Sequence, residues 1–179
     1  MPDQVLAESS FSHIIRAPIE RVNIADWLLH LPNAEYQRCC PPAHIACGTT
    51  TTDDGRPMSI NVEMIGDSLL IQQYVGEITE PDHCRMVSIS DVFSPAGRTT
   101  SRVVWDLSAT PLDDHRCEYI NQVTATPTDE FVAFIGEHGI SFQQAAAARQ
   151  DASSAHNQQE TPLYAESIER RAIAVTPTA

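Results

Sequence analysis

The sequence predicts one α+β domain in which an antiparallel sheet curls around a long helix near the C-terminus. A chain of 179 residues is long enough for one core and short for two. Six β-rich runs follow one another between about residues 43 and 126, and an alanine-rich helical pattern follows them. The connections between the runs are too short for crossover helices, so neighbouring strands should be antiparallel.

A strand and a helix come before the six runs. Residues 9–16 form the first strand, which Pro18 stops because proline cannot donate to a β-ladder. From Ile19 to Leu31 apolar residues recur near helical spacing, and Pro32 ends the pattern. We expect an amphipathic helix here, broken near Asn23 and therefore present as one or two short helices.

Five clusters of turn residues delimit the six strands that follow. The turn clusters contain Gly, Pro, Asp and Ser, which supply the backbone geometry that tight turns need. The expected strands are residues 43–52, 57–65, 68–79, 83–93, 98–110 and 115–126. With the first strand they make a sheet of about seven strands.

The last helix should begin near Pro127, because Thr128 and two acidic residues provide an N-cap and a favourable first turn. Gly139 predicts an interruption beside His138. From residue 151 the sequence turns polar, and we expect a new short helix to begin at Thr161-Pro162. In that interpretation residues 156–163 cap the start of the new helix. The alternative is that they form a lid over the mouth of a cavity.

These elements divide the chain into three parts. We expect an N-terminal tail at residues 1–8, the folded domain at 9–156 and a C-terminal extension at 157–179. The extension leaves homodimerisation open.

Composition excludes several functions. The formal charge of −13, with eleven arginines and no lysine, argues against nucleic acid and excludes lysine Schiff-base chemistry. No secretory signal or membrane span is recognisable, so we expect a cytoplasmic protein. The five cysteines have irregular spacing and suit free thiols better than disulfides.

The element order and two segments resemble a known family. Residues 11–22, which run from the first strand into an Ala-Pro-Ile-Glu helix start, and the strand at 103–107 are similar to the SRPBCC superfamily, also called START or Bet v 1-like helix-grip proteins. The resemblance spans about residues 9–150. It implies a sheet gripping the last helix around a small-molecule cavity, and functions such as hydrophobic-ligand carrier, polyketide cyclase or aromatase.

The candidate ligand-binding residues are the polar and aromatic side chains expected on the inner strand faces. Aromatic rings give an organic ligand shape, and a phenol or amide offers directed hydrogen bonds. Core packing is the alternative role for each aromatic residue, and a solvated outer face is the alternative for Glu63. The candidates are Tyr74, Trp105, Tyr119 and Asn121, then Asn61 and Glu63 if their face turns inward, and His138 at the helix break.

We predict no cofactor and no metal. The run from Cys39 to Cys47 holds three thiols and His44, but its spacing does not match a paired Cys-x-x-Cys zinc site. The oxygenase branch of the resembled superfamily needs two histidines and a carboxylate for iron, and no compact pair is evident, although distant ligands stay open.

Three functions follow from these observations. The first is binding of a hydrophobic or aromatic metabolite, as in a lipid or metabolite carrier. The second is an enzyme of the polyketide cyclase, aromatase or dehydratase type, with unassigned catalytic residues. The third is a co-chaperone-like interaction protein. Both of the first two need the same cavity, so the sequence leaves open whether the protein is an enzyme.

Overall fold

The computed structural model describes residues 4–174, so parts of the expected N-terminal tail and C-terminal extension lie outside the described residues. Seven strands and several helices follow one another along the chain. In order they are β1 (Ala7–Ile15), the short 3₁₀ turn η1 (Ile19–Arg21), α1 (Ile24–Leu29), α2 (Asn33–Cys39), β2 (His44–Thr51), β3 (Pro57–Ile65), β4 (Ser68–Thr79), β5 (His83–Ser94), β6 (Gly97–Asp113), β7 (Arg116–Pro127), α3 (Asp129–Glu137) and α4 (Phe142–Ala174).

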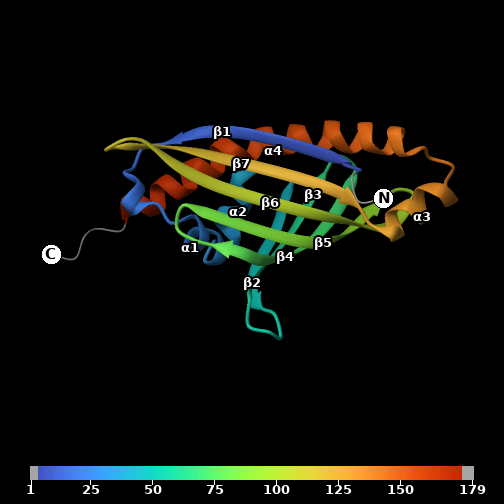
Figure 1. The fold of residues 1–179 in the computed structure, drawn as a ribbon, viewed down its shortest axis with the longest axis horizontal. Coiled ribbons are helices and arrows are strands. Elements are labelled where there is room, and N and C mark those ends of the chain that lie inside the picture. The colour runs from blue at the N-terminus through green and yellow to red at the C-terminus, as the bar shows by residue number, and fades with distance from the viewer. Residues whose placement is uncertain (1–3, 175–179) are drawn as a thin grey trace.

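The seven strands form one antiparallel sheet in the order β1-β7-β6-β5-β4-β3-β2. Strands β2 to β7 form a meander because each connection is a short turn, and β1 adds beside β7 at the other edge. Figure 1 shows α4 running along one face of the sheet, close to β1 and β7. The predicted fold class, a curved antiparallel sheet around a long C-terminal helix, is confirmed.

The region after β1 holds two short helices, in agreement with the one or two expected there. Asn23 caps α1, because its side-chain oxygen accepts a hydrogen bond from the backbone N–H of Asp26 at 2.9 Å. Helix α2 was not predicted, because it begins directly after Pro32, which was expected only to end a helix. The fixed φ of Pro32, −66°, suits the start of a helix as well.

The predicted interruption between the last two helices is confirmed. Thr128 caps α3 by accepting from the N–H of Phe131 at 3.1 Å. His138 follows as the C-terminal residue of that helix, and Gly139 has a φ of +66°, which glycine adopts without strain.

Helix α4 is longer than predicted and passes through Pro162 without ending. The expected new helix start at Thr161-Pro162 is therefore wrong, as is the capping interpretation of residues 156–163. The expected domain boundary after residue 156 falls inside this helix. Polar contacts hold α4 on β1: Asn157 Nδ2 donates to Ser9 Oγ at 2.8 Å, and Gln150 donates to the carbonyl of Glu8 at 2.9 Å.

The inner strand faces combine apolar core residues with polar side chains. On β6, Trp105 and Leu107 point inward as predicted and are nearly inaccessible. On β3 the buried face is the polar one, which carries Asn61 and Glu63. Glu63 is 5% exposed, so the alternative of a solvated outer face is wrong. Within residues 4–174, no helix is both long and apolar enough to cross a membrane.

Candidate functional site

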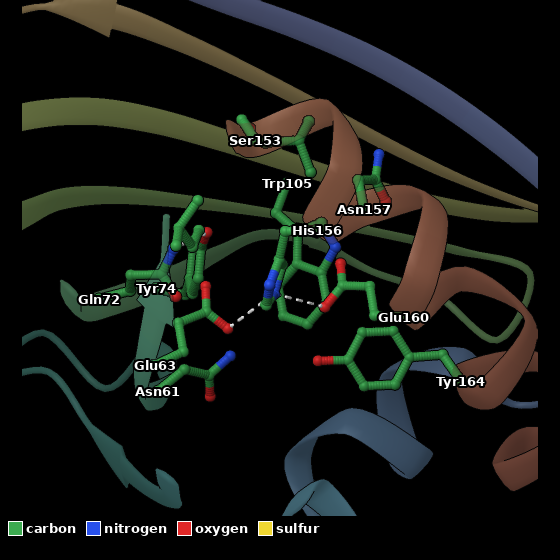
Figure 2. A pocket seen from close by; sticks show the side chains of 12 residues that line it. Asn61, Glu63, Gln72, Tyr74, Trp105, Ser153, His156, Asn157, Glu160 and Tyr164 are labelled. Atoms are coloured by element: carbon green, nitrogen blue, oxygen red, sulfur yellow. Dashed lines mark hydrogen bonds and ion pairs between the residues drawn. The ribbon is translucent and has the colours of Figure 1, made fainter. Parts of the chain in front are cut away.

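Four ionisable side chains meet in the interior between the sheet and α4. They are His44 from β2, Glu63 from β3, and His156 and Glu160 from α4, and each side chain is at least nine-tenths buried. We call them the His-Glu cluster. Figure 2 shows His156 lying between the two carboxylates, with an interaction drawn to each.

Strand register and helix periodicity bring these four residues together. His44 is the cross-strand partner of Glu63 in the β2-β3 pair, so their side chains share a sheet face. His156 and Glu160 are four positions apart on α4, the spacing that places side chains on one side of a helix. The docking of α4 across the sheet then closes the cluster.

Neighbouring groups hold the cluster through directed hydrogen bonds. His44 Nδ1 lies 2.8 Å from the backbone carbonyl of Tyr36, and a carbonyl only accepts, so Nδ1 carries the proton. The Tyr36 hydroxyl donates to Glu63 Oε2 at 2.8 Å. On the other side, Asn121 Nδ2 donates to Glu160 Oε1 at 3.0 Å, and Trp105 Nε1 donates to Asn121 Oδ1 at 2.9 Å.

Proximity and burial shift the pKa values of the cluster. Burial raises the pKa of Glu160, but hydrogen bonds from His156 and His44 outweigh it and lower that pKa to about 2. The pKa of Glu63 is lowered as well, because the attraction of His156 outweighs burial. For His156, burial acts to lower the pKa, and the two carboxylates raise it above its ordinary value. These directions favour charged carboxylates beside the imidazoles.

A small polar cavity lies against the cluster. Its volume is about 30 Å³, and Glu63, His156 and Glu160 line it. Its other lining residues are Asn61, Ile65, Gln72, Tyr74, Trp105, Val123, Ser153, Asn157 and Tyr164. This volume has room for water rather than for an organic ligand.

A second, larger cavity lies beyond Ile65, which lines both. Its volume is about 370 Å³, and its walls come mainly from apolar side chains of α3, α4 and the β5-β6 turn. We call it the apolar cavity. Two of its lining hydroxyls, Thr99 Oγ1 and Ser101 Oγ, are buried and have no hydrogen-bond partner within residues 4–174. Arg149 also lines it and makes no ion pair among the described residues.

The structure separates the predicted ligand-binding residues into three groups. Four of them line the small polar cavity: Asn61, Glu63, Tyr74 and Trp105. Asn121 is fully buried behind that wall and bonds to Glu160, and Tyr119 is buried in the core, where its hydroxyl has no partner among residues 4–174. His138 is exposed, lies against Phe134 with ring centroids 4.3 Å apart and the rings tilted by 37°, and lines neither cavity. Ligand contact by these residues stays a prediction.

Three members of the cluster, His44, His156 and Glu160, were not among the predicted site residues. His156 and Glu160 carry the helical i, i+4 signal, which the expected helix break at 161–162 obscured. His44 was considered only together with the nearby cysteines. Its partner Glu63 lies across a strand pair, and the pairing register gives the one signal that joins them.

Comparison with known proteins identifies similar structures but no similar sequences. No family model matches the chain, and no curated protein sequence matches it. Among solved structures, the Zhui aromatase/cyclase from Streptomyces sp. R1128 has a TM-score of 0.68 at 9% identity, over 92% of this chain and 94% of that one.

Two further solved structures have the same arrangement. The di-domain aromatase/cyclase StfQ from the steffimycin biosynthetic pathway has a TM-score of 0.60 at 14% identity, over 93% of this chain and 53% of that one. Norcoclaurine synthase from Thalictrum flavum, in complex with dopamine and hydroxybenzaldehyde, has a TM-score of 0.50 at 12% identity, over 96% and 88%. At these identities the likeness shows a shared fold.

Proposed function

We propose that this chain, which has the helix-grip fold of the SRPBCC superfamily, binds a hydrophobic or aromatic small molecule in the apolar cavity. The observation that carries the proposal is the cavity itself. Its volume of about 370 Å³ falls in the range that binds small organic ligands, and its walls are mainly apolar with a few polar groups. Such a composition is typical of small-molecule sites.

The polar groups in the wall indicate the chemistry of the ligand. Thr99 and Ser101 line the cavity, but their hydroxyl oxygens are buried beneath its surface and have no partner within residues 4–174, so they do not face a ligand. Arg149 offers a cationic donor to the same space. A ring system or short chain with a ketone, phenol or carboxylate oxygen would suit apolar walls with this one cationic donor.

Turnover by a polyketide cyclase, aromatase or dehydratase type of reaction is the second candidate function. The observation that favours it is the buried His-Glu cluster, which lines the polar cavity next to the apolar one. Two of the similar structures are aromatase/cyclases by name. A carrier without turnover needs no such cluster, and a co-chaperone-like role, cytoplasmic location and homodimerisation stay predictions of the sequence.

The proposal is tested by ligand binding to matched variants of α4. Native mass spectrometry of the purified protein identifies any retained molecule, and titration with 8-anilinonaphthalene-1-sulfonate, an aromatic anion, measures affinity. Ala145 lines the apolar cavity, whereas Ala147 is exposed and lines neither cavity. We expect Ala145→Phe to weaken binding about tenfold or more and Ala147→Phe to change it little.

Two results would contradict the proposal. One is a wild-type protein that retains no small molecule and does not bind the probe. The other is equal weakening by Ala145→Phe and Ala147→Phe, which would place the probe on the surface of the helix. Turnover is tested separately, by incubating wild-type protein with any molecule that native mass spectrometry identifies and following its conversion.

A further inference from the structure

We propose that His44, Glu63, His156 and Glu160 bind one divalent transition-metal ion, with Zn²⁺ as the best match. The proposal goes beyond small-molecule binding and does not depend on it. Ligand atoms of the four side chains all lie within 4.8 Å of one another. The residues come from two strands and a helix, so the tertiary fold assembles the site.

The distances within the cluster match a tetrahedral metal site. His44 Nε2 lies 3.1 Å from Glu160 Oε2, 3.3 Å from Glu63 Oε2 and 3.3 Å from His156 Nε2. His156 Nε2 lies 3.3 Å from Glu63 Oε2 and 3.4 Å from Glu160 Oε2. These are five of the six edges of a tetrahedron, and the sixth, between the two carboxylate oxygens, is within 4.8 Å. A regular tetrahedron with edges like these five has its centre about 2.0 Å from each corner, which is the length of zinc bonds to nitrogen and carboxylate oxygen.

Hydrogen bonding alone explains these contacts poorly. An imidazole N–H points along one direction and donates to one acceptor, yet each Nε2 is nearly equidistant from both carboxylate oxygens. The two Nε2 atoms also face each other at 3.3 Å. Since the proton of a neutral His44 resides on Nδ1, its Nε2 presents a lone pair to the centre. With both imidazoles neutral, four electron-pair donors converge on one point, which is the arrangement that a metal ion occupies.

The charge balance of the four side chains supports a dication. Two carboxylates carry two negative charges, and a divalent ion with neutral imidazoles brings the sum to zero. Buried charge is costly unless it is compensated, so a neutral set is favoured in this interior. Zinc suits the set because it accepts mixed nitrogen and oxygen ligands in a tetrahedron.

Outer hydrogen bonds orient the proposed ligands, as is usual in metal sites. The Tyr36 carbonyl holds the ring of His44, and Asn121 holds the Oε1 oxygen of Glu160 and leaves Oε2 for the ion. Cys40 Sγ lies 3.9 Å from Nδ1 of His156, and it is within 4.8 Å of ligand atoms of both histidines. A thiolate is therefore the competing ligand, which a sulfur shell would reveal.

The proposed ion would lie beside the small polar cavity, from which a water molecule could reach it. Glu63, His156 and Glu160 line the polar cavity of about 30 Å³, which accommodates a water molecule. Figure 2 shows these side chains together with Tyr74 and Asn61 around the same space. An ion there joins β2, β3 and α4, and can also meet a small oxygen ligand from the cavity.

The experiment is metal analysis of the full chain. Purified protein is dialysed with Zn²⁺, freed of excess ion and measured by plasma mass spectrometry, before and after treatment with a strong chelator. We expect about one zinc per chain, and X-ray absorption at the zinc edge should show nitrogen and oxygen ligands at about 2.0 Å with imidazole scattering. A sulfur shell near 2.3 Å would overturn the assignment in favour of Cys40.

Matched variants locate the ion. His156→Gln and Glu160→Gln should each weaken Zn²⁺ binding by about 100-fold or more, and Asn121→Leu, which removes an outer hydrogen bond, by about 10- to 100-fold. The exposed His115→Gln serves as the control and should bind like wild type.

The absorption spectrum of wild-type protein keeps the test decisive if a variant does not fold. Three results would overturn the proposal: no stoichiometric binding of Zn²⁺, Co²⁺ or Mn²⁺ by wild type, an ion without imidazole ligands, or an ion that folded His156→Gln and Glu160→Gln variants retain.

Discussion

Replacing Asn121 by aspartate tests the polar contacts that hold Glu160. The amide donates from Nδ2 to Glu160 Oε1 at 3.0 Å and accepts from Trp105 Nε1 at 2.9 Å, and the side chain is fully buried. Asn121→Asp keeps the size and the acceptor for Trp105. It replaces the donor by an oxygen, so two carboxyl groups then meet at hydrogen-bond distance.

The expected loss of stability is large for one nearly isosteric change. An unpaired or repelled buried charge destabilises a protein by about 3–5 kcal/mol. In a domain of this size that lowers Tm by roughly 6–20 °C. The assay is urea denaturation followed by tryptophan fluorescence, with a chelator present so that no bound metal contributes. Gln73→Glu makes the same charge change at an exposed position of β4 and should shift stability by no more than about 0.5 kcal/mol.

The pH dependence gives a second check with a definite sign. Burial and Glu160 raise the pKa of the introduced carboxyl above its unfolded value of about 3.9, so the native state binds more protons than the unfolded state. Stability of Asn121→Asp relative to Gln73→Glu should therefore fall as pH rises from 4 to 7. A deficit below about 1 kcal/mol at pH 7, or one that is the same at pH 5 and 7, would refute this account of the contact.

Three further predictions concern the same interior. Tyr36→Phe removes the hydroxyl that donates to Glu63 and should destabilise the protein by about 1.5–3 kcal/mol in the same assay; a loss below about 0.5 would show that the bond contributes little. Gly76→Ala should lower the free energy of unfolding by about 1–3 kcal/mol, because the added Cβ would lie 2.8 Å from Thr79 Cγ2. The Cβ of Gly48→Ala meets nothing within 4 Å, so this control should leave stability unchanged, and equal effects of the two changes would contradict the prediction. Finally, all five cysteines are free, so a thiol reagent should modify five groups after unfolding. Burial raises the pKa of Cys39 and Cys84 to about 12, so at pH 8 the reagent should modify these two thiols slowly in the native protein. Rapid modification of Cys39 and Cys84 in the native protein would refute this prediction.

Much of the fold was predictable because local chemistry determines it. Turn residues separate the strands, and short connections leave antiparallel pairing as the simple solution. Thr128 and Gly139 mark the start and the end of α3 through backbone geometry that depends on a few neighbouring residues. Trp105 was placed inward by the alternation of its strand, and that is where it lies.

The continuity of α4 was not predictable from the same signals. Its inner side carries buried polar residues, among them Ser153, Asn157 and Thr161. Asn157 bonds to Ser9 and Asn121 on the sheet, and the Thr161 hydroxyl bonds back to Asn157. Hydrophobic periodicity detects a helix only where its buried side is apolar. Here the polar composition is typical of a surface segment, and Pro162 is typical of a helix start, so the two together predicted a break that the structure does not have.

The sequence by itself determined the order of elements, the antiparallel sheet, the interruption before α4 and the absence of lysine chemistry, because each depends on residue type or on near neighbours. The tertiary structure alone decided that the polar face of β3 turns inward and that His44 and Glu63 meet His156 and Glu160. His44 and His156 lie 112 positions apart along the chain. Strand pairing and the packing of α4 on the sheet bring the ligand atoms of the four residues close to a common point. No pattern within a short stretch of sequence predicts that the strand residues and the helix residues meet.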